Sequence, residues 1–574
     1  MNLDLATVPF SRYGSYLAFS FLRQPHAVPL LGPSQALPEG VYLRTVRGDT
    51  FSREILRLEL LQGQTPIPYT VHATPSCLRL EAQVGHVEIC ISEPKVIRIR
   101  GTGVSLQLTM APGMFTYALP LGDSHWQINS FMQRMSYLLT PLVGQLVMDA
   151  PWSVDRAAHI IARFVPDAET GTLECAIEEF QSVWVPRAYS ESFAACRQAV
   201  DQEYRQWLDQ MPGVPPRYAA ARELAAYVDW SCVVAPDGHL TRPAMYMSKN
   251  WMTNVWSWDH CFNAMALAYH NPALAWDQFM LLFDCQDAQG ALPDSVNDRL
   301  MVWNFCKPPI HGWTLKRLME RTDWITTRQL REVYGPLSRW TDWWFTYRDD
   351  DHDGIPQYNH GNDSGWDNCT AFETGLPLES PDLSAFLVIQ MGTLADVALR
   401  LDKPRAAKAW QKRADELLAR LLAHSWRGDR FVAPRSGDHK VTEANTLFLF
   451  LPLILGEKLP RDVRSALISG LTEPGRFITA HGLATESPAS ALYQPDGYWR
   501  GPIWAPSTMI LVDGLAAVGE TALARELSGK FCDMAARSGM AENYDALTGA
   551  GLRDRAYTWT ASVFLILAHE YLQG

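Results

Sequence analysis

Four segments of the chain combine tryptophan with side chains that could bind sugar hydroxyls or carry out acid–base chemistry. They are NVWSWDHCFN (254–263), GALPDSVNDRLMVWNFCKPP (290–309), GNDSGWDN (361–368) and DGYWRGPIW (496–504). Indole rings stack on the apolar faces of a pyranose, while carboxylate, amide and cationic groups hydrogen-bond to its hydroxyls. One such segment could simply be an amphipathic tryptophan at a domain edge. Four of them together favour a carbohydrate site.

Asp367 is the carboxyl group best suited to act as an acid. A solvated turn uses Gly, Asn, Asp and Ser freely, as 361–368 does, but it has little reason to include Trp366. An indole beside Asp367 could exclude water and raise the pKa of the carboxyl group, as a general acid requires. Hydrolysis of a glycosidic bond needs a second carboxyl group. Glu542, in the polar turn GMAENYDALTG, is the candidate partner.

Five motifs in a fixed order make the pattern specific. WSWDHCFNAMAL, ALPDSV with KPP, GNDSGWDN, GYWRGPIW and AENYD follow one another across roughly residues 220 to 560. In this order they resemble glycoside hydrolase family 63 and the related family 37 trehalases. The resemblance implies an (α/α)6 barrel, inversion of anomeric configuration and exo-action on α-linked glucose or mannose. It also implies that Asp367 is the general acid and Glu542 the general base.

The resemblance extends to residues that would bind the terminal sugar. These are Trp258, Asp259, Lys307, Asp363, Trp366, Trp499, Arg500 and Tyr544. The chain departs from the trehalases at Phe305, Lys307 and Asp363, where those enzymes carry arginine, glutamine and glutamate. The departures favour the family 63 side and argue against trehalose as the substrate.

The stretch RDDDHDGIPQYN has the spacing of a calcium loop. Asp349, Asp351 and Asp353 stand at alternate positions before a glycine. His360 occupies the twelfth position, where such loops carry an acidic residue. Some family 63 members hold calcium in a loop of this kind, and the resemblance implies the backbone carbonyl of Ile355 as a further ligand. We therefore expect a structural calcium ion, with a helix-capping turn as the alternative, and no cofactor for catalysis.

The periodicity of the sequence predicts which elements position these residues. Short β-branched and aromatic runs with period-two alternation indicate an antiparallel β-sandwich over 1–185. A helical stretch over 186–216 is expected to link it to the rest. Over 217–574 the period is near 3.6, and the resemblance makes this part the (α/α)6 catalytic barrel. One apolar stripe comprises Leu330, Val333, Leu337, Trp340 and Trp344, and a second apolar stripe runs along 382–401.

Composition narrows the class of protein and of partner. With 574 residues, two domains are expected, and 47% apolar with 20% charged residues is typical of a soluble globular protein. The net charge of −12, without a cluster of Lys and Arg, argues against a nucleic-acid partner. Ten scattered cysteines indicate reduced thiols. The sequence shows no signal-peptide pattern or membrane-spanning run, so we expect a cytoplasmic protein without a membrane partner.

Four functions are compatible with these observations. The leading expectation is an inverting exo-acting α-glycoside hydrolase, an α-glucosidase acting on a small α-glucoside. Hydrolysis of glucosylglycerate or mannosylglycerate is the alternative, which cationic Lys307 or Arg500 would suit. A sugar phosphorylase would need a phosphate cradle in place of the base, and Glu542 argues against it. A non-catalytic sugar-binding protein would not need both carboxyl groups. The sequence does not specify the oligomeric state.

Overall fold

The structure, a computed structural model, describes residues 1–23, 37–48, 53–122 and 124–573. Its contacts divide the chain into two compact units. The first comprises Met1–Asp209, Trp230–Ala235 and Ser248–Thr253, and the second comprises Gln210–Asp229, Pro236–Met247 and Asn254–Gly574. The residues expected to form a linker, 186–216, therefore lie mostly within the first unit, and they include helix α1 (Phe193–Gln210).

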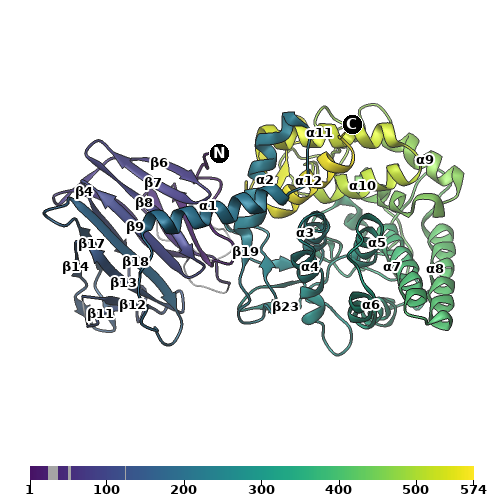
Figure 1. The fold of residues 1–574 in the computed structure, drawn as a ribbon. Helices are drawn as coiled ribbons and strands as arrows, with labels where there is room; N and C mark the ends of the chain where they lie inside the picture. The colour runs from purple at the N-terminus through teal and green to yellow at the C-terminus, as the bar shows by residue number, and fades with distance from the viewer. Residues whose placement is uncertain (24–36, 49–52, 123, 574) are drawn as a thin grey trace. The chain divides into compact units, whose positions relative to one another are not determined.

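The first unit contains two antiparallel sheets, which form two layers (Figure 1). One sheet has the strand order β1-β2-β3-β4-β10-β17-β14, with β5 beside β4: β1 Phe10–Ser11, β2 Leu17–Leu22, β3 Gly40–Thr45, β4 Glu54–Gln62, β5 Thr65–Ile67, β10 Ser105–Met110, β14 Gln145–Asp149, β17 Ile160–Val165. The other has the order β11-β12-β13-β18-β9-β8-β7-β6: β6 Thr70–Thr74, β7 Cys77–Ala82, β8 Gly85–Glu93, β9 Val96–Thr102, β11 Tyr117–Pro120, β12 Trp126–Ser130, β13 Met135–Val143, β18 Thr172–Phe180. A short hairpin joins β15 (Trp152–Ser153) and β16 (Arg156–Ala157).

Alternation along the strands explains why these sheets form. In β10, Leu106, Leu108 and Met110 are buried, whereas Gln107 and Thr109 between them are partly exposed. Successive side chains of a strand point to opposite faces, so this pattern gives each strand one apolar face for the core. The antiparallel sheets expected at the N-terminus are therefore present.

The second unit is mainly helical. Its helices are α2 Ala219–Cys232, whose last residues belong to the first unit, α3 Asp259–Leu267, α4 Pro272–Asp284, α5 His311–Arg321, α6 Thr327–Tyr347, α7 Pro381–Arg400, α8 Pro404–Ser425, η4 Leu447–Lys458, α9 Arg461–Leu471, α10 Ala505–Ala517, α11 Thr521–Ser538 and α12 Thr558–Glu570. On α6 the buried residues include the whole predicted stripe, Leu330, Val333, Leu337, Trp340 and Trp344. The residues of α6 outside this buried set are partly or fully exposed, as an amphipathic helix requires.

Helix α7 differs from the single apolar stripe that the sequence predicted. Ser384, Gln390 and Thr393 are buried together with its apolar residues, so the helix is covered on nearly all sides. A helix that is apolar around most of its circumference belongs in a core. Among the described residues α7 alone is long and apolar enough to cross a membrane, and 83% of its most apolar window is buried inside the protein.

Six helices pack in a closed cycle. Helix α3 contacts α5, α5 contacts α7, α7 contacts η4, η4 contacts α10, α10 contacts α12, and α12 returns to α3. Five further helices lie against members of this cycle, with α4 on α3, α6 and α8 on α7, α9 on η4 and α11 on α10 (Figure 1). The segments that carry the motifs connect these helices.

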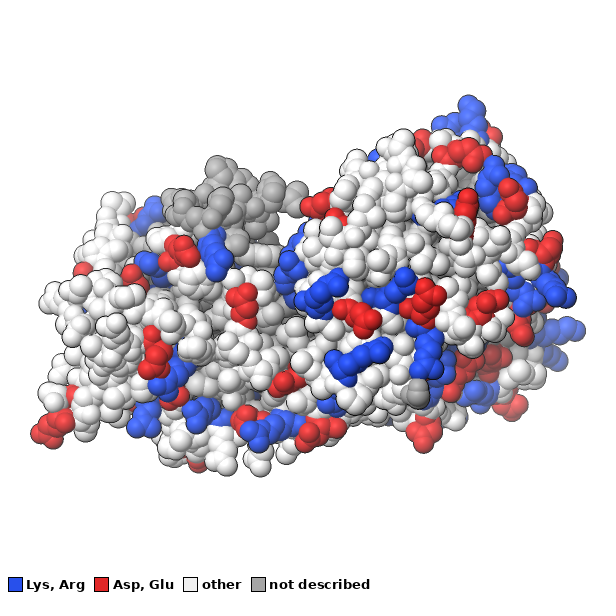
Figure 2. Space-filling view, turned by 90° about the horizontal axis from the view of Figure 1, so that it is seen from above, with Lys and Arg blue, Asp and Glu red and all other residues white. Residues whose placement is uncertain are grey.

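Charged side chains on the surface are mixed in sign. On the face seen in Figure 2, Lys and Arg are interspersed with Asp and Glu. Ion pairs also occur between side chains of the described residues, and Arg242, for example, pairs with Asp277, Asp284 and Glu332 at 3.2, 2.7 and 2.8 Å. That face has no continuous basic stripe, and the expectation of no nucleic-acid partner stays a prediction.

All ten cysteines are free thiols, as their spacing predicted.

Candidate active site

Asn368 joins the Asp367 loop to the segment 496–504. Its side-chain nitrogen donates to the Gly497 carbonyl at 3.0 Å, and its side-chain oxygen accepts from the Trp499 amide at 3.0 Å. The Arg500 guanidinium donates to the Asn368 carbonyl at 2.8 Å. Three hydrogen bonds therefore fix two segments that lie far apart in the sequence.

Lys307 joins the segment 290–309 to the same loop. Its ammonium group donates to the Asn362 carbonyl at 2.8 Å and pairs with the Asp294 carboxylate at 3.0 Å. Next to it, the Cys306 amide donates to Asp363 at 3.1 Å. Lys307 is only 4% exposed. A buried cation so surrounded fixes the geometry of both segments.

Gly365 brings the Asp367 loop against Trp258. Its φ is +73°, in the left-handed region that glycine adopts without steric cost. A Cβ at this position would lie 2.4 Å from the Trp258 ring. The short helix Gly361–Ser364 ends here. No residue other than glycine fits between this turn and the indole.

The turn that carries Glu542 is tied to the segment 496–504. Tyr544 and Ile503 exchange two backbone hydrogen bonds of 2.7 and 3.0 Å. The Tyr544 hydroxyl donates to the Gly539 carbonyl at 2.6 Å and accepts from the Ala541 amide at 3.1 Å. Short strands β24 (Asn543–Tyr544) and β25 (Gly551–Leu552) close the turn. The main chain beside Glu542 is therefore held on both sides.

Five tryptophans pack together among these segments. Trp499 and Trp504 stack with ring centroids 4.0 Å apart and planes 5° apart, and Trp366 lies 4.5 Å from Trp499. Trp559 lies 5.8 Å from Trp258 and 5.5 Å from Trp504. Each is at most 4% exposed. Trp366 and Trp258 directly precede Asp367 and Asp259, so the cluster gives these carboxyl groups apolar neighbours along the chain.

Tyr498 lies close to three carboxyl groups at once. Burial raises the pKa of its phenol well above the usual value, and the charges of Glu542, Asp367 and Asp259 and a hydrogen bond with Glu542 raise it further. Tyr498 takes this position with φ of +64°, a strained value for a residue other than glycine. Asp367 and Glu542, 175 positions apart in the sequence, therefore lie around one phenol.

Asp367 and Asp259 are both held toward the neutral form. Burial raises the pKa of Asp367, the nearby Lys307 cation opposes the shift, and Asp294 adds to it. Burial likewise raises the pKa of Asp259, which begins helix α3 and is 3% exposed. Asp367 itself is partly exposed. A raised pKa together with access to solvent is what a general acid requires.

Glu542 is 5% exposed, and burial raises its pKa to about 7. The charge of Asp554 adds to the shift, while the Arg553 cation and a hydrogen bond from Tyr498 oppose it. A general base must be ionised to take a proton from water. Because the pKa of Glu542 is about 7, its ionised form, which a general base needs, predominates above about pH 7.

Residues 252–560 match the family model described as the mannosylglycerate hydrolase MGH1-like glycoside hydrolase domain. The match spans more than half of the chain and all five motifs, including both Asp367 and Glu542. The chain belongs to this family. It is therefore a glycoside hydrolase by family, and the resemblance drawn from the motifs is confirmed.

Two relatives and one solved structure show how far the likeness extends. A mannosylglycerate hydrolase of Thermus thermophilus is 32% identical over 116 residues, which cover 20% of this chain and 28% of that protein. A glucosylglycerate hydrolase of Mycolicibacterium hassiacum is 24% identical over 408 residues, 54% of this chain and 91% of that protein. The crystal structure of a GH63 mannosylglycerate hydrolase from Thermus thermophilus in complex with Tris superposes with a TM-score of 0.53 at 20% identity, over 60% and 99% of the two chains.

Several residues expected to bind sugar have their polar atoms engaged by the protein. Both oxygens of Asp363 accept backbone amides, from Cys306 at 3.1 Å and from Asn359 at 2.9 Å. Arg500 pairs with Glu373 at 3.0 Å and also donates to a carbonyl, and Tyr544 is fully buried. These contacts favour a role in holding the loops of the glycoside hydrolase. Direct binding of sugar by these residues stays a prediction.

Three residues near Asp367 and Glu542 were not predicted from the sequence. Tyr498 and Asp294 lie inside the motifs GYWRGPIW and ALPDSV, and their position there was the available signal. Tyr557 lies outside every motif. Burial raises the pKa of its phenol, and the charges of Glu542 and Asp259 raise it further, so it too faces the acidic centre.

The expected calcium loop brings its three aspartates together. One carboxylate oxygen from each of Asp349, Asp351 and Asp353 lies within 4.8 Å of the other two. Each also accepts a backbone amide, from Gly354 at 3.2 Å, from Asp353 at 3.3 Å and from Ile355 at 2.8 Å respectively. Three carboxylates so placed fit a hard cation, and the same hydrogen bonds are those of a capping turn. Calcium binding stays a prediction.

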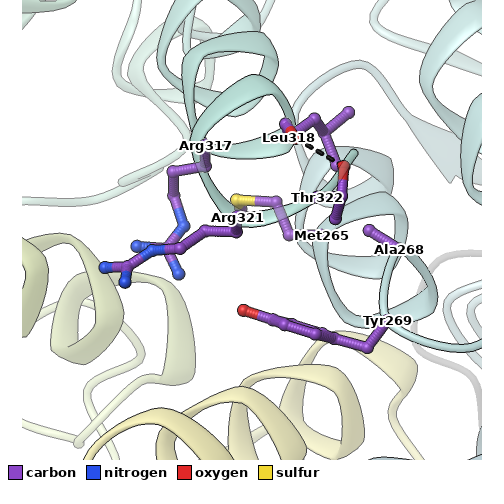
Figure 3. Close-up of a pocket in the computed structure, with 7 residues that line it drawn as sticks. All are labelled: Met265, Ala268, Tyr269, Arg317, Leu318, Arg321 and Thr322. Carbon is purple, nitrogen blue, oxygen red and sulfur yellow. Dashed lines mark hydrogen bonds between the residues drawn. The ribbon is translucent and has the colours of Figure 1, made fainter. Parts of the chain in front are cut away.

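A small cavity at the ends of α3 and α5 does not suit a sugar. It is lined by Met265, Ala268, Tyr269, Arg317, Leu318, Arg321 and Thr322 (Figure 3). Its volume is about 10 Å³, near the space that one water molecule needs. Arg317 is paired with Asp513 and Glu570. The cavity is therefore a gap beside an internal ion-pair network.

The pKa of Glu542 predicts the acid side of the pH profile. We expect kcat/KM to fall below about pH 7, because protonated Glu542 cannot accept a proton from water. Arg553 lowers the pKa of Glu542, so Arg553→Gln should move this limb to higher pH. Arg430→Gln, at an arginine paired with Asp429 and Glu443, is the matched control and should leave the limb in place. An acid limb unmoved by Arg553→Gln would contradict the assignment of Glu542.

Proposed function

We propose that the protein hydrolyses an α-glycoside of glycerate, mannosylglycerate or glucosylglycerate, to the free sugar and glycerate. The observation that carries the proposal is the family match over 252–560, supported by relatives whose names give these two activities. The relatives favour this substrate class over the small α-glucoside that the sequence first indicated. The proposal includes both glucose and mannose as the terminal sugar.

The proposed chemistry assigns one step to each carboxyl group. Asp367 donates its proton to the glycosidic oxygen as the bond to the anomeric carbon breaks, and glycerate leaves as the alcohol. Glu542 takes a proton from a water molecule that attacks the anomeric carbon from the opposite face. Support comes from the shared neighbour Tyr498 and from burial, which raises the pKa of both groups.

We further propose that the helical unit is an (α/α)6 barrel. Its support is the closed cycle α3, α5, α7, η4, α10 and α12, with a second set of helices packed outside it. In such a barrel the loops between helices converge at one end. The hydrogen bonds that join the segments 290–309, 361–368, 496–504 and 540–545 agree with that arrangement.

A glycerate leaving group brings a carboxylate, which calls for a cation near the catalytic pair. Each nearby cation has a carboxylate partner: Lys307 pairs with Asp294, Arg500 with Glu373, and Arg553 with Asp496 at 2.6 Å, where the Asp496 side chain is 66% exposed. Arg553 lies 4.9 Å from the Tyr498 ring centroid and affects the pKa of Glu542, and its side chain is 31% exposed. We assign Arg553 as the cation that meets the substrate carboxylate.

A substrate panel tests the proposed function. The purified protein is assayed with α-mannosylglycerate, α-glucosylglycerate, the matching methyl α-glycosides, maltose and trehalose, with Asp367→Asn as the inactive control. We expect kcat/KM to be highest for a glycerate glycoside, and Arg553→Gln to reduce the preference over the methyl glycoside. Equal or better turnover of maltose or the methyl glucoside would restore the α-glucosidase interpretation.

A further inference from the structure

A second cluster of ionisable side chains lies where the connection between α6 and α7 meets the end of α8 and the segment after it. It consists of Asp353, Glu379, His424 and His439. One ligand atom from each lies within 4.8 Å of every other. Two imidazoles and two carboxylates at such spacing are a set of donors that a metal ion can share.

Glu379 is the side chain that points to a ligand. It is fully buried, and neither of its carboxylate oxygens accepts a hydrogen bond. His424 Nε2 lies 2.7 Å from Glu379 Oε2, yet that nitrogen has no hydrogen-bond partner either. The two groups approach each other without the alignment of a hydrogen bond. Burying an unpartnered carboxylate is costly, and a cation between the two groups would offset that cost.

The other distances are near those of a tetrahedral ion. His439 Nε2 lies 3.7 Å from Glu379 Oε2 and 3.8 Å from Asp353 Oδ2. It also lies 3.1 Å from Asp351 Oδ2, a contact that a bound ion would replace. Zinc bonds of about 2.0–2.1 Å at tetrahedral angles place ligand atoms roughly 3.3–3.4 Å apart. Shifts of up to about 0.6 Å, the largest between His424 Nε2 and Glu379 Oε2, would bring these atoms to that spacing.

The backbone holds the ligands in place. Leu378, next to Glu379, forms antiparallel bridges with Tyr358 on one side and Arg435 on the other. The Glu379 amide donates to the Pro434 carbonyl at 2.9 Å. Helix α8 carries His424 in its last turn. The four ligands thus come from four segments that secondary structure already joins, which is the preorganisation a structural metal site needs.

We propose that Asp353, Glu379, His424 and His439 bind a transition-metal ion of the zinc class. Calcium takes oxygen ligands almost exclusively, whereas imidazole nitrogens suit zinc and its neighbours. Four protein ligands leave no open position, so the ion is structural. Asp353 belongs both to this cluster and to the aspartate loop 349–353. Because two of the four ligands are imidazoles, the proposed ion is a softer cation than the calcium expected from the spacing of that loop.

Metal analysis of the full chain tests the site. The protein is stripped with a chelator, dialysed against zinc or calcium, and measured by elemental analysis and thermal melting. We expect about one zinc ion per chain and a higher Tm with zinc than with calcium. The double variant His424→Gln/His439→Gln should lose the ion and the rise in Tm. His239→Gln, at an exposed histidine outside the cluster, should retain both.

A second variant keeps the test informative if the double variant folds poorly. Glu379→Gln retains both imidazoles and the shape of the buried side chain, and it should weaken zinc binding at least tenfold. The proposal is overturned if calcium raises the Tm of wild type and double variant alike while zinc does not. It is also overturned if neither ion binds, which would leave only an ion pair between His424 and Glu379.

Discussion

Asp367→Asn is expected to lower kcat/KM on a glycoside with an unactivated leaving group by on the order of a hundred- to ten-thousandfold. The amide keeps the shape of the side chain but cannot deliver a proton to the departing oxygen. The loop should keep its structure, because the bonds that fix it are made by Asn368 and by main-chain groups. Steady-state kinetics, with circular dichroism to confirm folding, measure the effect.

Two comparisons separate lost acid catalysis from damage to the site. On a glycosyl fluoride, whose leaving group needs no proton, Asp367→Asn should retain most of the wild-type rate. Asp363→Asn is the matched control in the same loop. Both of its oxygens accept backbone amides, so it should lower the Tm more than Asp367→Asn does and affect both substrates alike. Wild-type turnover of a natural glycoside by Asp367→Asn would refute the assignment.

The candidate site could be proposed from the sequence because it depends on residue types in short motifs. Asp367 follows a tryptophan and Glu542 lies in a polar turn, and both carry signals that need no knowledge of the fold. The part played by Asn368 could not be predicted. Its three hydrogen bonds join segments about 130 positions apart, and nothing local indicates which distant amide or carbonyl an asparagine will meet.

Three polar residues that were predicted to bind sugar show the same limit of prediction from sequence. Asp363, Arg500 and Tyr544 are suitable sugar ligands by chemistry, yet their polar atoms are taken up by the main chain and by Glu373. A sequence shows which groups a side chain could bind, but it does not show which group contacts that side chain in the folded protein. The strands and the α6 stripe were predictable, since periodicity reports burial directly. The buried polar side of α7 was not, because enclosure depends on neighbouring helices.

Glu542→Gln is expected to abolish hydrolysis while leaving a stable protein that still binds substrate. The sign of the stability effect follows from its pKa, which is about 7 in the folded protein and 4.5 ordinarily. A carboxyl group with a raised pKa stabilises the fold below its ordinary pKa, and this contribution is lost as pH rises through the folded value. At pH 8 the buried charge costs on the order of a few kcal/mol. The variant should therefore melt higher than wild type at pH 8 and not at pH 4.

The anomer released first decides how Glu542 acts. An inverting enzyme holds a water molecule between base and sugar, with its carboxyl groups about 6.5–9.5 Å apart, whereas a retaining enzyme attacks directly across roughly 5–5.5 Å. If Glu542 activates water, an α-glycoside gives the β-sugar first, and proton NMR within minutes of mixing will detect it before mutarotation. Release of the α-anomer would make Glu542 a nucleophile. Calorimetry on Glu542→Gln should show substrate binding near the wild-type KM, because the amide keeps its hydrogen bond with Tyr498 and removes only the base.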